Sequence, residues 1–135
     1  MAVTDAHGVP LAINIHSASP HETKLVESTL EARFIADLPK RLVGDKAYDS
    51  DTLDEQLKEK GIDLVAPHRK GRKKAPTQDR RKLRRYKRRW KVERFFAWLF
   101  NYRRCIARHE YKAQNFKAVL LLASIMIYLK SYFHL

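Results

Sequence analysis

The sequence predicts an α/β fold. Short runs of β-branched and apolar residues alternate with amphipathic stretches up to residue 67, a pattern typical of strands and helices in one layered domain. The 135 residues are enough for one domain with a core. Their hydrophobic content, 44%, is ordinary for a globular protein. The expected order is a β-hairpin, a helix, a strand, a helix, a strand, a basic loop and two long helices.

The hairpin and the first helix are predicted from turn and capping residues. Residues 2–18 contain two apolar runs separated by Asp5-Ala6-His7-Gly8, which is a turn signal. Ser19-Pro20-His21-Glu22 has the form of a capping box with Pro at the first helical position, so a helix is expected to begin there. The helix is expected over residues 22–34, with Leu25, Leu30 and Phe34 on its apolar side.

Three further elements are expected before residue 68. Residues 41–44 form a short strand that ends at Asp45, and residues 62–67 form another. Between them a helix is expected, with Ser50 or Asp51 as its cap and Gly61 as its C-terminal stop. Three acids near its start are interpreted as capping and first-turn residues: Asp49, Asp51 and Asp54.

The second half of the chain is predicted to be a basic loop and two helices. The loop covers residues 68–79, and the helices are expected over 79–104 and 115–133. The longest apolar run, residues 118–129, has twelve residues between two lysines. Spanning a bilayer takes about 20 residues, so a buried helix is expected and no membrane association.

The positive charge is concentrated in residues 69–94. This segment holds fifteen Lys and Arg against Asp79 and Glu93, so it carries the whole net charge of +13. Such a density indicates a polyanion as partner. Apolar and aromatic residues lie between the charges, which argues against an unstructured tail: Leu83, Tyr86, Trp90 and Val92.

Two carboxylates are candidates for chemistry. Glu93 shares a narrow helical face with Tyr86 and Arg89 at about 100° per residue. Asp45 lies at the C-terminal end of a strand, where open α/β sheets bind ligands. Separated carboxylates on a basic surface favour Mg²⁺ chemistry on phosphates. The ordinary alternatives are an Arg89–Glu93 ion pair one turn apart and a turn-capping role for Asp45.

Other chemistry has little support. The six histidines show no paired metal-ligand spacing, and a single cysteine cannot build a structural zinc site. Cys105 also cannot form an internal disulfide, which fits a reducing cytoplasm. The four glycines are dispersed, so no glycine-rich phosphate loop is present.

At these residues the chain resembles a known family. "GDKAYDS" followed by "YKRRWKVERFF" resembles the C-terminal half of the catalytic domain of bacterial insertion-sequence transposases of the DDE type. Asp45, Lys46, Tyr48 and Asp49 match the family's D-[KR]-x-Y-D motif. Tyr86, Arg89 and Glu93 match the first three positions of its Y-x2-R-x3-E-x6-K signature, and Phe100 replaces the lysine.

The resemblance implies a partial ribonuclease-H-like domain over residues 1–135. Its first central strand, which carries the first catalytic Asp, would be missing, leaving a gap in the sheet. Asp5 would then be a turn residue. Asp45 and Glu93 would be catalytic ligands of Mg²⁺ or Mn²⁺, with Tyr86 and Arg89 orienting Glu93 or contacting phosphate. Further DNA contacts are expected from Lys46, Arg84, Arg85, Arg88, Arg103 and Arg104.

The implied function is that of the C-terminal portion of a DNA transposase. It would cleave and join DNA in a metal-dependent reaction, and would be inactive without an upstream segment. The expected partners are element ends and target DNA, together with further copies of the chain or the product of an upstream frame, in the cytoplasm at the nucleoid. Two alternatives remain: a non-catalytic DNA-binding fragment that regulates or inhibits the full enzyme, and a basic RNA-binding protein.

Overall fold

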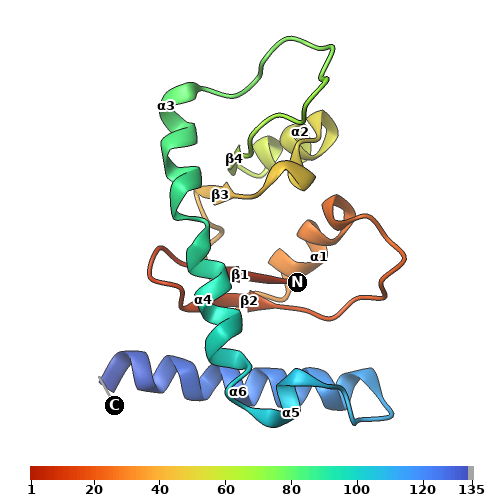
Figure 1. The fold of residues 1–135 in the computed structure, drawn as a ribbon, viewed down its shortest axis with the longest axis vertical. Helices are drawn as coiled ribbons and strands as arrows, with labels where there is room; N and C mark the ends of the chain where they lie inside the picture. Colours follow the sequence, from red (N-terminus) through yellow and green to blue (C-terminus); the bar gives the residue numbers. More distant parts are fainter. Residues whose placement is uncertain (134–135) are drawn as a thin grey trace.

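The computed structural model describes residues 1–133, whose strands form two separate pairs (Figure 1). β1 (Ala2–Thr4) pairs antiparallel with β2 (Pro10–Ile13), whereas β3 (Arg41–Val43) pairs parallel with β4 (Asp63–Val65). Within residues 1–133 no strand ladder joins the two pairs. The α/β class is therefore confirmed.

The hairpin has the predicted turn. Asp5 Oδ1 accepts hydrogen bonds from the backbone N–H groups of His7 at 2.7 Å and Val9 at 2.9 Å. Asp5 is thus a turn residue, as expected. Gly8 has a φ of +86°, and a Cβ there would lie 3.0 Å from the carbonyl oxygen of Lys91. Gly8 therefore lets the turn approach the later helix closely.

The first helix differs from the prediction at both ends. It starts as the 3₁₀ helix η1 (Glu22–Leu25), continues as α1 (Val26–Glu31), and is capped by the His21 side chain, so the predicted Ser19 cap is wrong. Its end is set by tertiary pairing, because Arg33 bridges to Ala12 of β2 and the N–H of Phe34 donates to Leu11. Phe34 consequently lies outside the helix and is 46% exposed, so its predicted apolar packing is also wrong.

The central elements follow the local signals. α2 (Asp51–Glu59) has Ser50 as its N-cap, and Gly61 follows it with a φ of +74°. Its buried Leu53 and Leu57 pack with residues of α1 and β4 in one hydrophobic cluster, which contains Val26, Leu30, Leu53, Leu57, Ile62, Leu64 and Ala66. This cluster supports β4 and, through the partly buried Leu42, also β3.

The long helix predicted over residues 79–104 is interrupted. It consists of α3 (Arg80–Leu83), the 3₁₀ helix η3 (Arg84–Arg88), α4 (Trp90–Leu99) and α5 (Arg103–Ile106). The sequence explains the first break: between Asp79 and Glu93 there is no carboxylate, and cations recur at i and i+4. Like charges at that spacing destabilise an α-helix.

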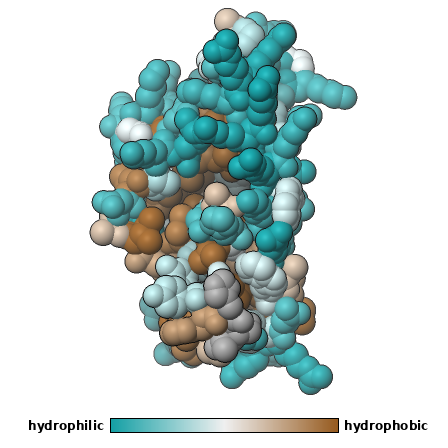
Figure 2. All heavy atoms as spheres, turned by 90° about the vertical axis from the view of Figure 1, so that its left-hand side faces the viewer, coloured by the Kyte–Doolittle hydropathy of each residue, from teal (hydrophilic) through white to brown (hydrophobic). Residues whose placement is uncertain are grey.

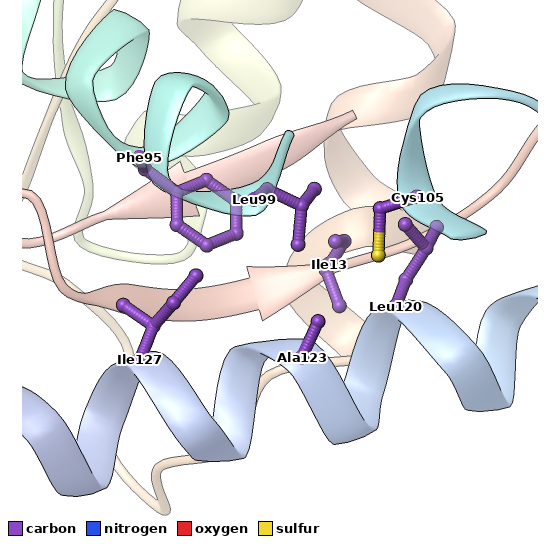
Figure 3. Packing of buried hydrophobic residues seen from close by; sticks show 7 residues of the cluster. All are labelled: Ile13, Phe95, Leu99, Cys105, Leu120, Ala123 and Ile127. Carbon is purple, nitrogen blue, oxygen red and sulfur yellow. The ribbon is translucent and has the colours of Figure 1, made fainter. Parts of the chain in front are cut away.

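The last helix, α6 (Ala113–Phe133), is buried on one side only. That side contributes Leu120, Ala123 and Ile127 to a second cluster with Ile13, Phe95, Leu99 and Cys105 (Figure 3). Leu122, Ile125, Met126, Tyr128, Leu129, Tyr132 and Phe133 are exposed, so the prediction of a buried helix holds for half of it. By length and composition α6 is a candidate membrane span, a criterion that core helices of soluble proteins also meet.

The segment from α3 to α4 connects the two parts of the molecule. Figure 1 shows it running from beside β3 past the hairpin to α6. At its lower end Phe95 and Leu99 are buried in the second cluster, and at its upper end Lys82 pairs with Asp63 of β4 at 2.8 Å. The middle of this segment therefore faces the turn that follows β3.

Candidate functional site

Asp45 stands where the polypeptide leaves β3. It caps the 3₁₀ helix η2 (Lys46–Tyr48), because its Oδ1 accepts the N–H of Ala47 at 2.7 Å. The carboxylate is half-buried and has a second oxygen that takes no part in this bond. The turn-capping role and the role of a ligand donor are thus compatible.

The predicted residues of the late helix meet this turn. Asp45, Lys46 and Ala47 line one wall of a cleft of about 290 Å³, and Tyr86 and Arg89 line the other. The Arg89 guanidinium lies 5.2 Å from the centre of the Tyr86 ring. Tyr86 and Arg89 were predicted to be neighbours on an α-helix, and they are also neighbours in the observed 3₁₀ helix, because residues three apart eclipse there.

Glu93 is connected to the cleft through Arg89. Its Oε1 lies 3.2 Å from Arg89 Nη1 in an i,i+4 ion pair, and its side chain is 63% exposed. An exposed pair of this kind is worth only about 0–1 kcal/mol. Arg89 therefore borders Asp45 on one side and holds Glu93 on the other by an interaction that is easily exchanged.

The turn that carries Asp45 is packed against an aromatic ring. Tyr48 lies over Gly44, where a Cβ would be 2.8 Å from its Cδ2 atom. Burial, with Glu22 and Asp45 nearby, raises the pKa of Tyr48 to about 12, so its hydroxyl stays protonated at neutral pH. Gly44 and Tyr48 together fix the direction in which the chain enters Asp45.

Gly44→Ala should destabilise the fold by about 1–3 kcal/mol, because the new methyl group must displace the Tyr48 ring. Unfolding monitored by circular dichroism measures the loss. The double variant Gly44→Ala, Tyr48→Ala should cost less than the sum of the single changes, since the clash is then removed. Additive losses would show that the ring is not what excludes a side chain at residue 44.

A second set of contacts, which sequence reasoning missed, fixes the turn after β3 that carries Asp45. The Arg69 guanidinium donates to the carbonyl oxygens of Lys46 at 3.0 Å and Ala47 at 2.7 Å. Asp49, whose side chain is 8% exposed, accepts from His68 Nδ1 at 2.8 Å and from the N–H of Arg69 at 2.7 Å. Asp49 is therefore an anchor for the basic loop, and its interpretation as a capping acid was wrong.

The other predicted DNA contacts fall into two groups. Arg84, Arg85 and Arg88 are exposed on η3. Arg103 is exposed on α5, whereas Arg104 pairs with Glu110. Burial would raise the pKa of Glu110, but hydrogen bonds, including the one from Arg104, hold it below the usual value. Arg104 is thus neutralised by a charged carboxylate.

Comparison with known proteins shows the family of the chain. The family of transposase DDE domains matches residues 1–130. The chain belongs to this family. A Burkholderia cepacia protein, "Putative transposase for insertion sequence element IS402", is 31% identical over 133 residues, covering 93% of this chain. No solved structure matches the chain.

This transposase domain spans 59% of the length of its IS402 relative. The family generally uses divalent metal ions, so the fit of the donor set matters. Within residues 1–133 no three His, Cys, Asp or Glu side chains gather as a metal cage. Mg²⁺ needs only one or two protein carboxylates when substrate oxygens and water complete its shell. Of the two candidate carboxylates only Asp45 lines the cleft, and Glu93 would join it at an ion only by exchanging its pairing with Arg89.

Proposed function

We propose that this domain is the C-terminal portion of a DNA transposase that cleaves and joins DNA at the ends of an insertion sequence. The observation that carries the proposal is the cleft in which Asp45 and Lys46 face Tyr86 and Arg89. It brings together residues 40 or more positions apart in the chain that match the two halves of the family's signature.

In this proposal Asp45 and Glu93 are the protein's ligands to Mg²⁺ or Mn²⁺. The ion would activate a water molecule and stabilise charge on the phosphate oxygens. Arg89 is positioned to take a phosphate oxygen once it leaves Glu93, since a guanidinium exchanges carboxylate for phosphate with little change in geometry. Tyr86 supports the guanidinium through its ring face, a contact worth about 0.5–1 kcal/mol at an exposed site.

The proposed partners are duplex DNA of element ends and target sites, at the bacterial nucleoid. The proposal includes a ribonuclease-H-like fold whose central strand would lie between the hairpin and β3, supplied by an upstream frame product in a fusion. Homo-oligomers are also proposed, because exposed apolar residues line α6. The second candidate function, a DNA-binding fragment that inhibits the full enzyme, is favoured by the incomplete metal cage in residues 1–133.

The test is a nicking assay on element-end DNA in Mg²⁺ or Mn²⁺. It compares this chain with an extended protein that carries the additional upstream segment. We expect cleavage by the extended protein only, because two carboxylates leave the bridging place of a metal pair empty. Robust cleavage by this chain alone would overturn the incomplete-site proposal, and no cleavage by either protein would favour the inhibitor.

A further inference from the structure

The cations of the basic segment, residues 69–94, fall into two groups: those paired with carboxylates of the fold and those without an ion pair within residues 1–133. Part of its charge is already neutralised by carboxylates elsewhere in the domain. Arg72, which is 14% exposed, lies 3.0 Å from Asp49 and 2.6 Å from Asp51. Lys74 lies 3.0 Å from the other oxygen of Asp51. These contacts fold the loop back onto the start of α2.

A similar contact fixes the beginning of α3. Lys82 Nζ lies 2.8 Å from Asp63 Oδ1, and Arg41 Nε lies 2.9 Å from Asp63 Oδ2. Asp63 is the first residue of β4, and Arg41 is the first residue of β3. The carboxylate of Asp63 thus ties α3 to both parallel strands. Arg72, Lys74 and Lys82 form what is called here the clamp.

The carboxylates that pair with the clamp cations are charged at neutral pH. Hydrogen bonds from Arg72 and Lys74 hold the pKa of Asp51 below its usual value. Burial would raise the pKa of both Asp49 and Asp63, but hydrogen bonds outweigh it and hold both pKa values below the usual one. The donors to Asp49 are Arg69, His68 and Arg72. The donors to Asp63 are Lys82 and Arg41. Each clamp cation therefore faces a full negative charge, and a DNA phosphate would have to compete with it.

The remaining cations of α3 and η3 have no such neighbour. Six side chains are exposed and make no ion pair within residues 1–133; they are called the ridge and comprise Arg80, Arg81, Arg84, Arg85, Lys87 and Arg88. Figure 2, which faces the side along which α3 and α4 run, shows a hydrophilic surface over most of its upper half. Nine residues of mixed α and 3₁₀ helix extend over roughly 15 Å, a length over which duplex DNA presents several phosphates.

We propose that the ridge is the surface that binds the phosphates of duplex DNA, and that the clamp cations hold the ridge in place without binding DNA. This inference rests on the proposed DNA-binding function and assigns its contacts to particular residues. It is narrower than the expectation from charge density, which assigned a polyanion partner to the segment as a whole. The ridge begins four residues before η3 and continues through it. Because Tyr86 of η3 lines the cleft with Asp45, DNA held on the ridge would extend toward that carboxylate.

The test uses two variants that remove the same number of charges from the full chain. The ridge variant is Arg84→Gln, Arg85→Gln, Arg88→Gln, and the clamp variant is Arg72→Gln, Lys74→Gln, Lys82→Gln. The affinity for a duplex oligonucleotide is measured against salt concentration, and the thermal midpoint of each protein is measured alongside. Because the net charge falls equally, a nonspecific effect of charge predicts the same result for both.

We expect the ridge variant to reduce the slope of log affinity against log salt by about 2.7, or 0.9 for each lost phosphate contact, with an unchanged thermal midpoint. The clamp variant should lower the thermal midpoint and change the slope by less than about 1. If that variant does not fold, Lys82→Gln alone serves as the clamp arm. Equal losses of slope would overturn the division, whereas a wild-type chain without salt-dependent DNA binding would overturn the proposed function itself.

Discussion

Asp45→Asn in the extended transposase should lower DNA cleavage by about a thousandfold or more and leave duplex binding within about twofold. A bound metal ion contributes several kcal/mol to the stabilisation of charge in the transition state, and about 4 kcal/mol corresponds to that factor. Asn keeps an oxygen that can cap Ala47, so the turn after β3 should persist. The change therefore removes the negative charge of Asp45, the proposed metal ligand, and little else.

The matched control is Asp37→Asn, which removes one negative charge from an exposed residue that makes no ion pair within residues 1–133. Single-turnover cleavage and duplex affinity are measured for both variants. Glu93→Gln should behave like Asp45→Asn, with the difference that Arg89 loses its charged partner. Near-normal cleavage by Asp45→Asn would show that the cleft between η2 and η3 is not the metal site.

Duplex DNA affinity of the isolated chain should fall roughly a thousandfold between 50 and 200 mM salt. Six ridge cations in contact with phosphates give a slope of about −5 in log affinity against log salt, which corresponds to that loss. Fluorescence anisotropy with a labelled duplex measures it. A flat dependence would contradict phosphate binding by the ridge, and tighter binding to an RNA hairpin of equal length would favour the RNA-binding alternative.

Local signals predicted the elements that depend on local chemistry. The hairpin turn at Asp5 and Gly8, the Ser50 cap and the Gly61 stop each involve neighbours a few residues apart, and each is present in the fold. The end of α1 could not be predicted in this way. It depends on pairing of Arg33 with Ala12, twenty-one positions earlier in the chain.

At the candidate site, too, features set by neighbouring residues were predictable and those set by distant contacts were not. The spacing of Tyr86, Arg89 and Glu93 predicted a common face, and the cleft brings two of these residues to Asp45. The roles of Asp49 and Arg69 were not predictable, because their contacts cross about twenty residues of sequence and Asp49 also suits a helix N-terminus. Charge composition likewise could not separate the clamp from the ridge, since the difference lies in which carboxylates fold against each cation.

The outward side of α6 has a practical consequence for handling the chain. It presents Leu122, Ile125 and Leu129 to water, while the net charge of +13 keeps copies of the chain apart by repulsion. Added salt screens that repulsion, and salting-out salts such as sulfate also strengthen apolar association. The conditions that release the ridge from nucleic acid during purification are therefore those that bring the α6 surfaces together. Preparations freed of DNA in concentrated salt should therefore be the most prone to precipitate.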